Sequence, residues 1–333
     1  MLKGRTILLI ISAATWIGSP AGFSAEKLAQ TGFQFLSVGT DAGATGMGEA
    51  YTTMEGGSNA LFYNPAGLAR LDKRVDATFS ANSWIADIKH YAATLAYKPA
   101  NGAWGTFGLS AMWIDYGELQ GTIVWNNSDG FRDTEKFSPS ALAMGFGYGK
   151  LLNDKFAVGG QVKVVAQSLG ESIIPVDHST ALGTVKKNVA STYAFDLGTI
   201  YHTGLKSLVF GMNVRNFSGE FEFEEESFQL PLTFKIGVSM DMLDLANRKP
   251  EGQSLLLCVD AAHPRSKAEY VSVGLRYTFM NMLNLRTGYI SGQDEYGVSF
   301  GFGVSAMGAT FDYAYTPFGV FDSVQRITAR IAM

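Results

Sequence analysis

The feature that most constrains the fold of this chain is a two-residue alternation of side chains, repeated from about residue 73 to the end. Residues 74–83 show it clearly, because Val, Ala, Phe and Ala at one parity alternate with Asp, Thr, Ser and Asn at the other. In the last segment Ile327 and Ile331 share one face, and Arg326 and Arg330 share the opposite face. Such a period is typical of β-strands whose two faces meet different environments. The sequence therefore predicts an all-β fold.

The alternation divides into fourteen candidate strands, at about residues 75–83, 89–98, 102–116, 137–151, 154–168, 188–202, 206–217, 229–243, 252–262, 268–280, 282–291, 295–305, 308–316 and 323–333. Short links follow the second, fourth and sixth segments, and long links follow the third, fifth and seventh, at 117–136, 169–187 and 218–228. Membrane β-barrels have an even number of strands joined by short turns on one side and longer loops on the other. The link 244–251 departs from this pattern, and residues 118–125 form either an additional strand or an extension of a neighbouring one.

The balance of residue types favours a barrel over a helical membrane protein. Hydrophobic residues make up 47% of the chain, yet apart from a shorter stretch at the start there is no apolar run of the roughly 20 residues that a spanning helix needs. Strands in hydrocarbon must close into a ring, since an unpaired backbone group there costs several kcal/mol. We therefore predict a 14-stranded antiparallel transmembrane β-barrel over residues 73–333. A water-soluble sandwich would usually reverse the faces, and the alternation by itself does not say which face is inside.

Aromatic residues near the ends of the candidate strands are suited to girdles at two lipid–water boundaries, although ordinary core aromatics would look the same. They are Trp84, Trp104, Trp113, Trp125, Tyr148, Tyr201 and Tyr315.

The first 25 residues have the features of a cleaved export signal. Lys3 and Arg5 precede the apolar stretch 6–18, and small residues follow it. Cleavage after Ala25 fits slightly better than cleavage after Ala21. We expect an exported protein of the cell outer membrane. The one cysteine, Cys258, lies far from this region and excludes both a lipid-anchored N-terminus and an internal disulfide.

Residues 26–72 lack the alternation and are rich in glycine. The spacing of Gly43, Gly46 and Gly48 inverts the order of a dinucleotide-binding loop and has no strand–helix context, so we expect no cofactor. Glycines permit tight turns and close approach of backbones, and Pro65 holds Asn64 extended before a short turn. We predict a compact hatch, or plug, inside the barrel.

Two runs within this segment resemble the hatch of FadL-like outer-membrane barrels, namely residues 46–51 (GMGEAY) and 59–68 (NALFYNPAGL). They look most like the PorV/PorQ branch, which shares the export signal, hatch and fourteen-strand layout. Residues 159–163 (GGQVK), 194–198 (AFDLG) and 311–319 (FDYAYTPFG) are similar to strands of that branch. The chain departs from the pattern in ending with Met333 instead of an aromatic residue.

The resemblance implies two alternative functions. PorV/PorQ-type proteins serve type IX secretion by binding or shuttling secreted partner proteins at the outer membrane, and the closer match favours this function. FadL-type proteins instead carry hydrophobic solutes such as long-chain fatty acids, with the hatch as a movable plug. In either case the resemblance assigns the shape of the hatch to Gly46, Gly48, Asn64, Pro65, Ala66 and Gly67, and predicts contact with outer-membrane lipid.

Residues suited to catalysis, metal binding or nucleic-acid binding do not form convincing patterns. The four histidines are widely separated, so a metal site is not expected. A G-x-S-x-G motif occurs at 297–301, but it falls inside a candidate strand without the turn that a nucleophile needs. Basic residues are scattered and the net charge is −4, which argues against nucleic-acid binding. We predict a protein that is not an enzyme.

Two long loops are candidates for contact with partners. Ile173 and Ile174 make the loop 169–187 apolar enough to cover the barrel mouth or meet a partner. The loop 218–228 contains a dense acidic and aromatic cluster that could bind a partner or a divalent ion, although a solvated loop or hairpin would have the same composition. The residues of that cluster are Phe221, Glu222, Phe223, Glu224, Glu225 and Glu226.

Overall fold

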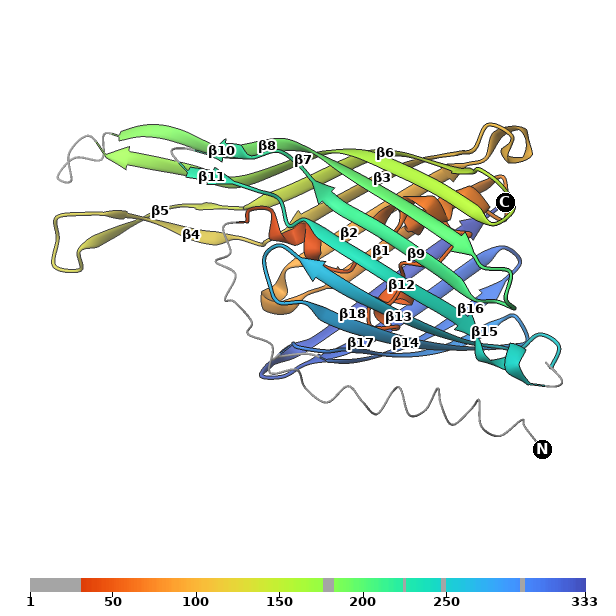
Figure 1. Ribbon diagram of the computed structural model, residues 1–333. Coiled ribbons are helices and arrows are strands. Elements are labelled where there is room, and N and C mark those ends of the chain that lie inside the picture. Colours follow the sequence, from red (N-terminus) through yellow and green to blue (C-terminus); the bar gives the residue numbers. More distant parts are fainter. Residues whose placement is uncertain (1–30, 176–182, 224–225, 247–249, 294–296) are drawn as a thin grey trace.

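The computed structural model describes residues 31–175, 183–223, 226–246, 250–293 and 297–333, and its main body is a closed ring of fourteen antiparallel strands (Figure 1). Around the ring the order is β1-β18-β17-β16-β15-β14-β13-β12-β9-β8-β7-β6-β3-β2. The strands are β1 (Val75–Ser83), β2 (Lys89–Tyr97), β3 (Thr106–Asp115), β6 (Ser140–Leu151), β7 (Phe156–Pro175), β8 (Gly183–His202), β9 (Val209–Phe217), β12 (Thr233–Asp241), β13 (Ser254–Pro264), β14 (Tyr270–Phe279), β15 (Leu283–Ile290), β16 (Val298–Ala306), β17 (Ala309–Phe318) and β18 (Phe321–Ala332).

The first and last strands close the ring. β1 and β18 pair from Asp76 opposite Ala332 to Ser83 opposite Gln325 without a break in register. The fourteen strands predicted from the alternation are confirmed, with boundaries that differ by a few residues at most ends and by more in β7 and β8.

The two faces of the ring answer the question that the alternation left open. On the paired strands β1 and β18, Phe79 and Ile331 point outward and are 48% and 52% exposed. Asp76 and Arg326, at the other parity, are buried inside the ring. Apolar residues outside and charged residues inside are what a barrel surrounded by hydrocarbon requires, and this arrangement excludes the water-soluble sandwich.

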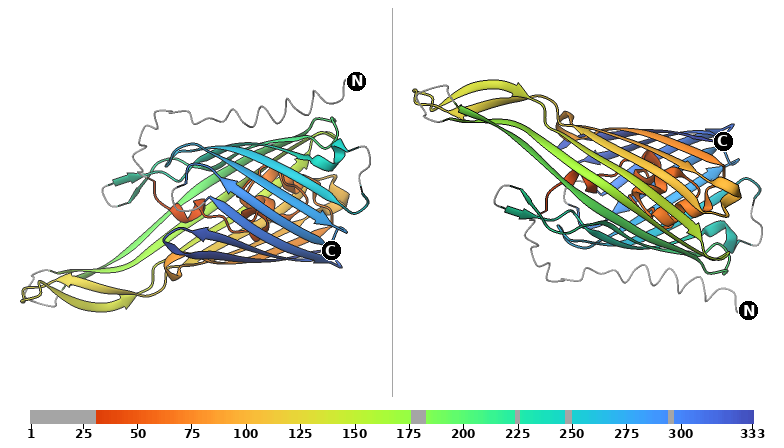
Figure 2. Two further views of the ribbon diagram at one scale, coloured as in Figure 1. Left: turned by 90° about the horizontal axis from the view of Figure 1, so that it is seen from below. Right: turned by 90° about the horizontal axis from the view of Figure 1, so that it is seen from above.

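Residues 31–71, here called the inner segment, lie within the ring (Figure 2). The segment contains four short helices, η1 (Gln34–Ser37), α2 (Ala42–Thr45), η2 (Ser58–Phe62) and η3 (Pro65–Arg70). None of them is longer than six residues, so packing against the strands holds them in place more than helix propensity does. Smaller 3-10 turns, η4 (Ile85–Asp87), η5 (Pro99–Gly102) and η6 (Met242–Leu245), join strands of the ring. Among the described residues no helix combines the length and apolar character needed to cross a membrane.

Hairpins project from one end of the barrel, here called the mouth end (Figures 1 and 2). One is β4 (Leu119–Val124) with β5 (Phe131–Phe137), and a smaller one is β10 (Phe221–Phe223) with β11 (Glu226–Phe228). β4 thus belongs to a separate hairpin and is not an additional strand of the ring.

The predicted loop 169–187 is wrong over its described ends, because β7 continues to Pro175 and β8 begins at Gly183. These ends pair with each other beyond the ring, for example Glu171 with Lys187. Both faces of this extension are largely exposed to solvent, so it carries no alternating apolar pattern by which it could be recognised.

The predicted export signal at residues 1–25 lies outside the described residues. The division into a hatch at 26–72 and a barrel at 73–333 stays a prediction.

Candidate functional site

Asn64 anchors the inner segment to the barrel. Its side chain is fully buried, and its amide nitrogen donates to the backbone oxygens of Thr52 at 2.7 Å and of Thr199 in β8 at 3.1 Å. Its amide oxygen accepts from the backbone nitrogen of Ala66 at 3.1 Å and caps η3, whose first residue is Pro65. An asparagine before a proline suits this position, because it satisfies free donors at a helix start. The motif found in the sequence therefore fixes where the inner segment turns.

The glycines of the motif allow close approach of backbones. A Cβ atom on Gly67 would lie 2.5 Å from the backbone oxygen of Met54, and one on Gly46 would lie 3.1 Å from the Cα atom of Gly301 in β16. Gly48 has a φ of +62°, and a Cβ there would lie 2.8 Å from the backbone nitrogen of Tyr289. These contacts give Gly46 and Gly48 a packing role between the inner segment and the wall, and Gly67 a packing role within the inner segment.

One half of the lumen is lined by charged and hydroxyl side chains. This charged wall consists of the inward faces of β1 and β13 to β18. Arg286 pairs with Asp312 at 2.6 Å, and Arg330 pairs with Asp76 at 2.6 Å. Asp260 accepts hydrogen bonds from the backbone nitrogen and hydroxyl of Thr52, at 3.0 and 2.7 Å. The inner segment therefore meets this wall through polar contacts.

Asp41 caps α2 close to the charges of the same wall. Its carboxylate accepts from the backbone nitrogen of Ala44 and from the side chain of Asn59, each at 2.9 Å. Burial, and next the nearby charge of Asp312, raise the pKa of the Asp41 carboxyl to about 6, against the lowering effect of those hydrogen bonds and of Arg286. This carboxyl therefore keeps its proton to a higher pH than an ordinary aspartate.

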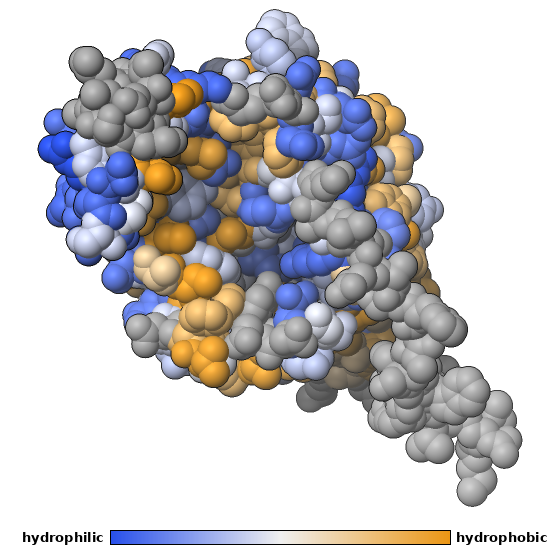
Figure 3. Space-filling model, turned by 90° about the vertical axis from the view of Figure 1, so that its left-hand side faces the viewer, coloured by the Kyte–Doolittle hydropathy of each residue, from blue (hydrophilic) through white to orange (hydrophobic). Residues whose placement is uncertain are grey.

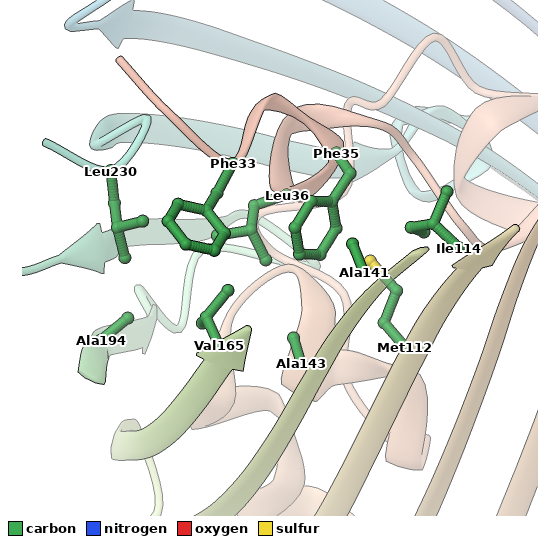
Figure 4. Packing of buried hydrophobic residues seen from close by; sticks show 10 residues of the cluster. All are labelled: Phe33, Phe35, Leu36, Met112, Ile114, Ala141, Ala143, Val165, Ala194 and Leu230. Atoms are coloured by element: carbon green, nitrogen blue, oxygen red, sulfur yellow. The ribbon is translucent and has the colours of Figure 1, made fainter. Parts of the chain in front are cut away.

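The opposite half of the lumen is mainly apolar. This apolar wall consists of the inward faces of β3, β6, β7 and β8. Its buried polar residues include Thr106, Ser110 with Gln161, which are hydrogen-bonded at 2.9 Å, and the ion pair of Lys163 with Asp196 at 2.8 Å. Toward the mouth end, three residues at and beside η1 pack against it (Figure 4). The buried members of this mouth cluster are Phe33, Phe35, Leu36, Met112, Ile114, Ala141, Ala143, Val165, Ala194 and Leu230.

A cavity of about 250 Å³, the mouth pocket, lies between the two walls above the inner segment. Cationic groups lie over aromatic rings around it. Arg326 is 5.3 Å from the ring centre of Trp84, Arg215 is 5.9 Å from that of Tyr63, and Lys267 is 5.2 Å from that of Tyr270. Leu36, Phe62 and Met112 bring apolar surface to the same cavity. Figure 3 views the mouth end and shows hydrophilic and hydrophobic residues around its hollow.

A second cavity of about 170 Å³, the rim groove, lies nearer the edge of the mouth. Its lining combines the inner faces of β7 and β8, the start of the inner segment and the aromatic residues of the β10–β11 hairpin. The lining residues are Gly32, Phe33, Gln167, Leu169, Ala190, Phe221, Phe223 and Phe228. Almost all of this surface is apolar, so the groove suits a hydrocarbon group.

The residues predicted as partner contacts in the outer loops lie in different surroundings in the structure. Phe221 and Phe223 line the rim groove, while Glu222 and Glu226 point to solvent. Ile174 is exposed on the β7 extension, in the same strand as Ile173. Glu224 and Glu225 lie outside the described residues.

The G-x-S-x-G motif, which the sequence did not assign to catalysis, lies in the wall of the barrel. Ser299 of the G-x-S-x-G motif lies in β16, and its hydroxyl accepts a hydrogen bond from the backbone nitrogen of Gly48 at 3.1 Å. Among the described residues, no group of three or more His, Cys, Asp or Glu side chains is placed to hold a metal ion.

The comparison with solved structures agrees with this architecture. CymD, a monoaromatic hydrocarbon channel, matches with a TM-score of 0.59 and 12% identity over 89% of this chain and 98% of that chain. The toluene transporter TodX of Pseudomonas putida matches at 0.55 and 14%, covering 86% and 96% of the two chains. A FadL homologue of Pseudomonas aeruginosa matches at 0.52 and 11%, covering 88% and 98%. The chain has the FadL-like fold. No protein-family model matches the sequence, and no curated protein matches it.

Within this FadL-like fold, the cationic residues of the mouth pocket were not recognised from the sequence as a site. Arg215, Lys235, Lys267 and Arg326 come from separate parts of the chain, and only the folded ring brings them together. The sequence signal for these residues was the two-residue alternation, which places Arg326 on the polar face of its strand. Parity identifies a residue as inward-facing but does not give its neighbours across the lumen.

Proposed function

We propose that this protein is an outer-membrane channel for hydrophobic solutes that carry an anionic head group, such as long-chain fatty acids. The observation that carries the proposal is the mouth pocket, where cations lie beside the apolar mouth cluster inside the lumen. Cations that are already stacked on aromatic rings are held in place to receive an anion. Apolar surface in an otherwise polar lumen suits the hydrocarbon part of the same molecule.

The likeness to CymD and TodX supports the transport of hydrophobic molecules, because those proteins are a hydrocarbon channel and a toluene transporter. Among the described residues that line the pocket, Arg215, Lys235, Lys267 and Arg326 are opposed by Glu49, which gives this lining a positive balance. That balance favours an acid over a neutral hydrocarbon. In this proposal residues 1–25 direct export, and residues 26–72 act as a plug between the mouth pocket and the other end of the barrel.

Binding can be followed through Trp84, which lines the mouth pocket. Purified protein in lipid vesicles is titrated with a spin-labelled stearic acid, and quenching of tryptophan fluorescence is measured. We expect saturable quenching that the Trp84→Phe variant largely loses. The Arg326→Gln variant should bind the acid more weakly but bind its methyl ester as the unaltered protein does. Equal quenching by acid and ester in the unaltered protein would refute the assignment of an anionic head.

Transport needs a separate measurement. Vesicles loaded with serum albumin trap a fatty acid that crosses the membrane, so uptake reports passage through the barrel. We expect protein-containing vesicles to accumulate the acid faster than protein-free vesicles. Uptake at the protein-free rate, together with normal binding, would show that the pocket is a receptor site and not part of a channel.

A second candidate function, binding of secreted partner proteins in the PorV/PorQ manner, is favoured by the projecting hairpins. The β4–β5 hairpin and the β7–β8 extension reach beyond the mouth and expose Val124, Phe131 and Ile174. Cross-linking of intact cells through cysteines introduced on these hairpins would test it. Capture of exported proteins by the hairpin cysteines, but not by a cysteine at Ala332 at the other end of the barrel, would support it.

A further inference from the structure

Arg276 is a cation of the charged wall that has no counterion in the described part of the chain. It lies on the inward face of β14, directly opposite Arg286 of β15. Asp312 pairs with Arg286, whereas the side chain of Arg276 makes no ion pair or hydrogen bond with any residue that the structure describes. Its Nε atom is buried and lacks an acceptor. Because an enclosed charge without a partner is unfavourable, we expect an anion beside Arg276.

This cation lies far from the mouth pocket. β14 begins at Tyr270, which lines the mouth pocket, and runs from there toward the opposite end of the barrel, where it ends at Phe279. Arg276 follows Tyr270 by six residues, which corresponds to about 20 Å of strand. Its side chain is partly exposed on the lumen side. An anion bound there would therefore occupy a place separate from the mouth pocket.

Two tyrosines of the inner segment lie between the two places. Tyr63 lines the mouth pocket, and its ring centre is 5.0 Å from that of Tyr51. Tyr51 in turn is close enough to Arg276 for the two side chains to interact electrostatically. Burial, and next the charge of Asp41, raise the pKa of the Tyr51 hydroxyl to about 12, against the lowering effect of Arg276. The hydroxyl therefore keeps its proton and can donate a hydrogen bond to an anion held by Arg276.

Apolar side chains flank Arg276. Leu256 faces it across the pairing of β13 with β14. Leu256, Met54 and Tyr51 pack against the same buried core, and all three are partly exposed. A guanidinium and a phenol, which both donate to carboxylates, thus lie beside apolar surface that suits a hydrocarbon chain.

We propose that Arg276 and Tyr51 form a second binding site, here called the exit site, for the carboxylate of the transported acid, with Leu256 and Met54 against its hydrocarbon chain. This proposal rests on the proposed function and adds a binding step on the far side of the inner segment. The mouth pocket has several cations and the exit site has one, so the acid binds more weakly at the exit site. Weaker binding there favours release from the barrel.

The test uses the full-length protein in lipid vesicles and a long-chain fatty acid that carries a diazirine near its carboxyl end. After illumination, labelled peptides are identified by mass spectrometry. We expect label on Trp84 or Phe62 of the mouth pocket and, separately, on Leu256 or Met54 of the exit site. Excess unlabelled stearate should prevent both labels, and excess acetate should prevent neither. Protection of the exit site by acetate would indicate a site for small anions and would overturn the proposal.

Variants at Arg276 provide the decisive comparison. Arg276→Gln should lower labelling of the exit site by about tenfold, because charge-assisted hydrogen bonds to the carboxylate are lost. Labelling of the mouth pocket should not change, which also shows that the variant is folded. Arg276→Lys keeps the charge and should retain part of the exit-site label. With the methyl ester of the probe, Arg276→Gln and the unaltered protein should give equal labelling.

Stability without the acid separates binding from a structural role. Because Arg276 has no partner among the described residues, Arg276→Met should not lower the urea midpoint of unfolding. Added stearate should raise the midpoint of the unaltered protein more than that of Arg276→Met, since a ligand stabilises the state that binds it. A large loss of stability in the absence of acid would show that Arg276 serves the fold and not a ligand.

Two labelling results would overturn the exit site while the proposed function stands. One is a labelled mouth pocket with no label on Leu256 or Met54, and the other is exit-site labelling that is equal in Arg276→Gln and the unaltered protein. Label at neither site would contradict the proposed function as well, because the acid would then not bind inside the barrel.

Discussion

The two walls of the lumen hold the inner segment by different physical means. On the charged wall, hydrogen bonds such as those from Thr52 to Asp260 and from the backbone nitrogen of Ala42 to Thr328 fix it at defined atoms. On the apolar wall, side chains such as Leu61 and Leu68 pack by shape. Polar contacts are costly to leave half-made, whereas apolar contacts lose stability in proportion to the volume removed. The charged wall therefore determines position, and the apolar wall can adapt to a hydrophobic guest.

The largest expected effect comes from removing one partner of a buried pair on the charged wall. Arg286→Met leaves Asp312 without its cation close to the carboxylate of Asp41, and should destabilise the protein by up to about 5 kcal/mol. Urea unfolding in lipid vesicles measures the loss. The double variant Arg286→Met with Asp312→Leu is the control, and it should recover most of the stability. A double variant as unstable as the single one would show that the pair itself, and not the unpaired charge, is what matters.

A somewhat smaller effect is expected on the apolar wall. Leu61 in η2 is almost completely buried beside Leu68, Leu71 and Ala96. Leu61→Ala should cost about 3–4 kcal/mol through lost transfer energy and the cavity that remains. The Leu61→Met variant, which nearly conserves volume, should lose less than half as much. Similar losses for Ala and Met would mean that the leucine shape, and not the buried volume, is required.

The third effect depends on pH. Asp41 has an ordinary pKa of 3.8 when unfolded and about 6 when folded. Between these values the unfolded chain releases its proton first, so the contribution of Asp41 to stability falls as pH rises, by about 3 kcal/mol in total, and is constant above about pH 6. The measurement compares unaltered protein and Asp41→Asn from pH 3.5 to 7.5. Their difference in unfolding free energy should change over this window, and a constant difference would contradict the raised pKa.

The strands were predictable from sequence because their cause is local. Alternation in residues 74–83 reflects two environments on two faces, and the ring follows from the need to pair every backbone group. The turn at Asn64 and Pro65 was predictable for the same reason. The buried polar contacts among Asn216, Asp196 and Lys163 were not, because these residues belong to three different strands. The extension of β7 was missed because a strand with water on both faces does not need apolar residues at every second position.

The smallest expected effects come from single substitutions that remove either a little buried volume or one hydrogen bond. The two walls should respond differently, because volume matters most on the apolar wall and hydrogen bonding on the charged wall. Ile200 on the apolar wall is completely buried, and Ile200→Val should cost about 1 kcal/mol. Thr328 on the charged wall accepts from the backbone nitrogen of Ala42 at 2.8 Å and also bonds with the hydroxyl of Ser80.

Thr328→Ser keeps this hydroxyl and loses one methyl group, so its cost should also be about 1 kcal/mol or less. Thr328→Val keeps the volume but leaves the Ala42 nitrogen without an acceptor, which should cost about 1–3 kcal/mol. Urea unfolding of the three variants under one condition gives the comparison. If hydrogen bonding determines position on the charged wall, Thr328→Val lowers the unfolding free energy more than Thr328→Ser does. If Thr328→Ser were the more destabilising of the two, packing by shape would hold the inner segment on both walls. The position of the segment would then be determined by close glycine contacts, such as that of Gly48 with Tyr289.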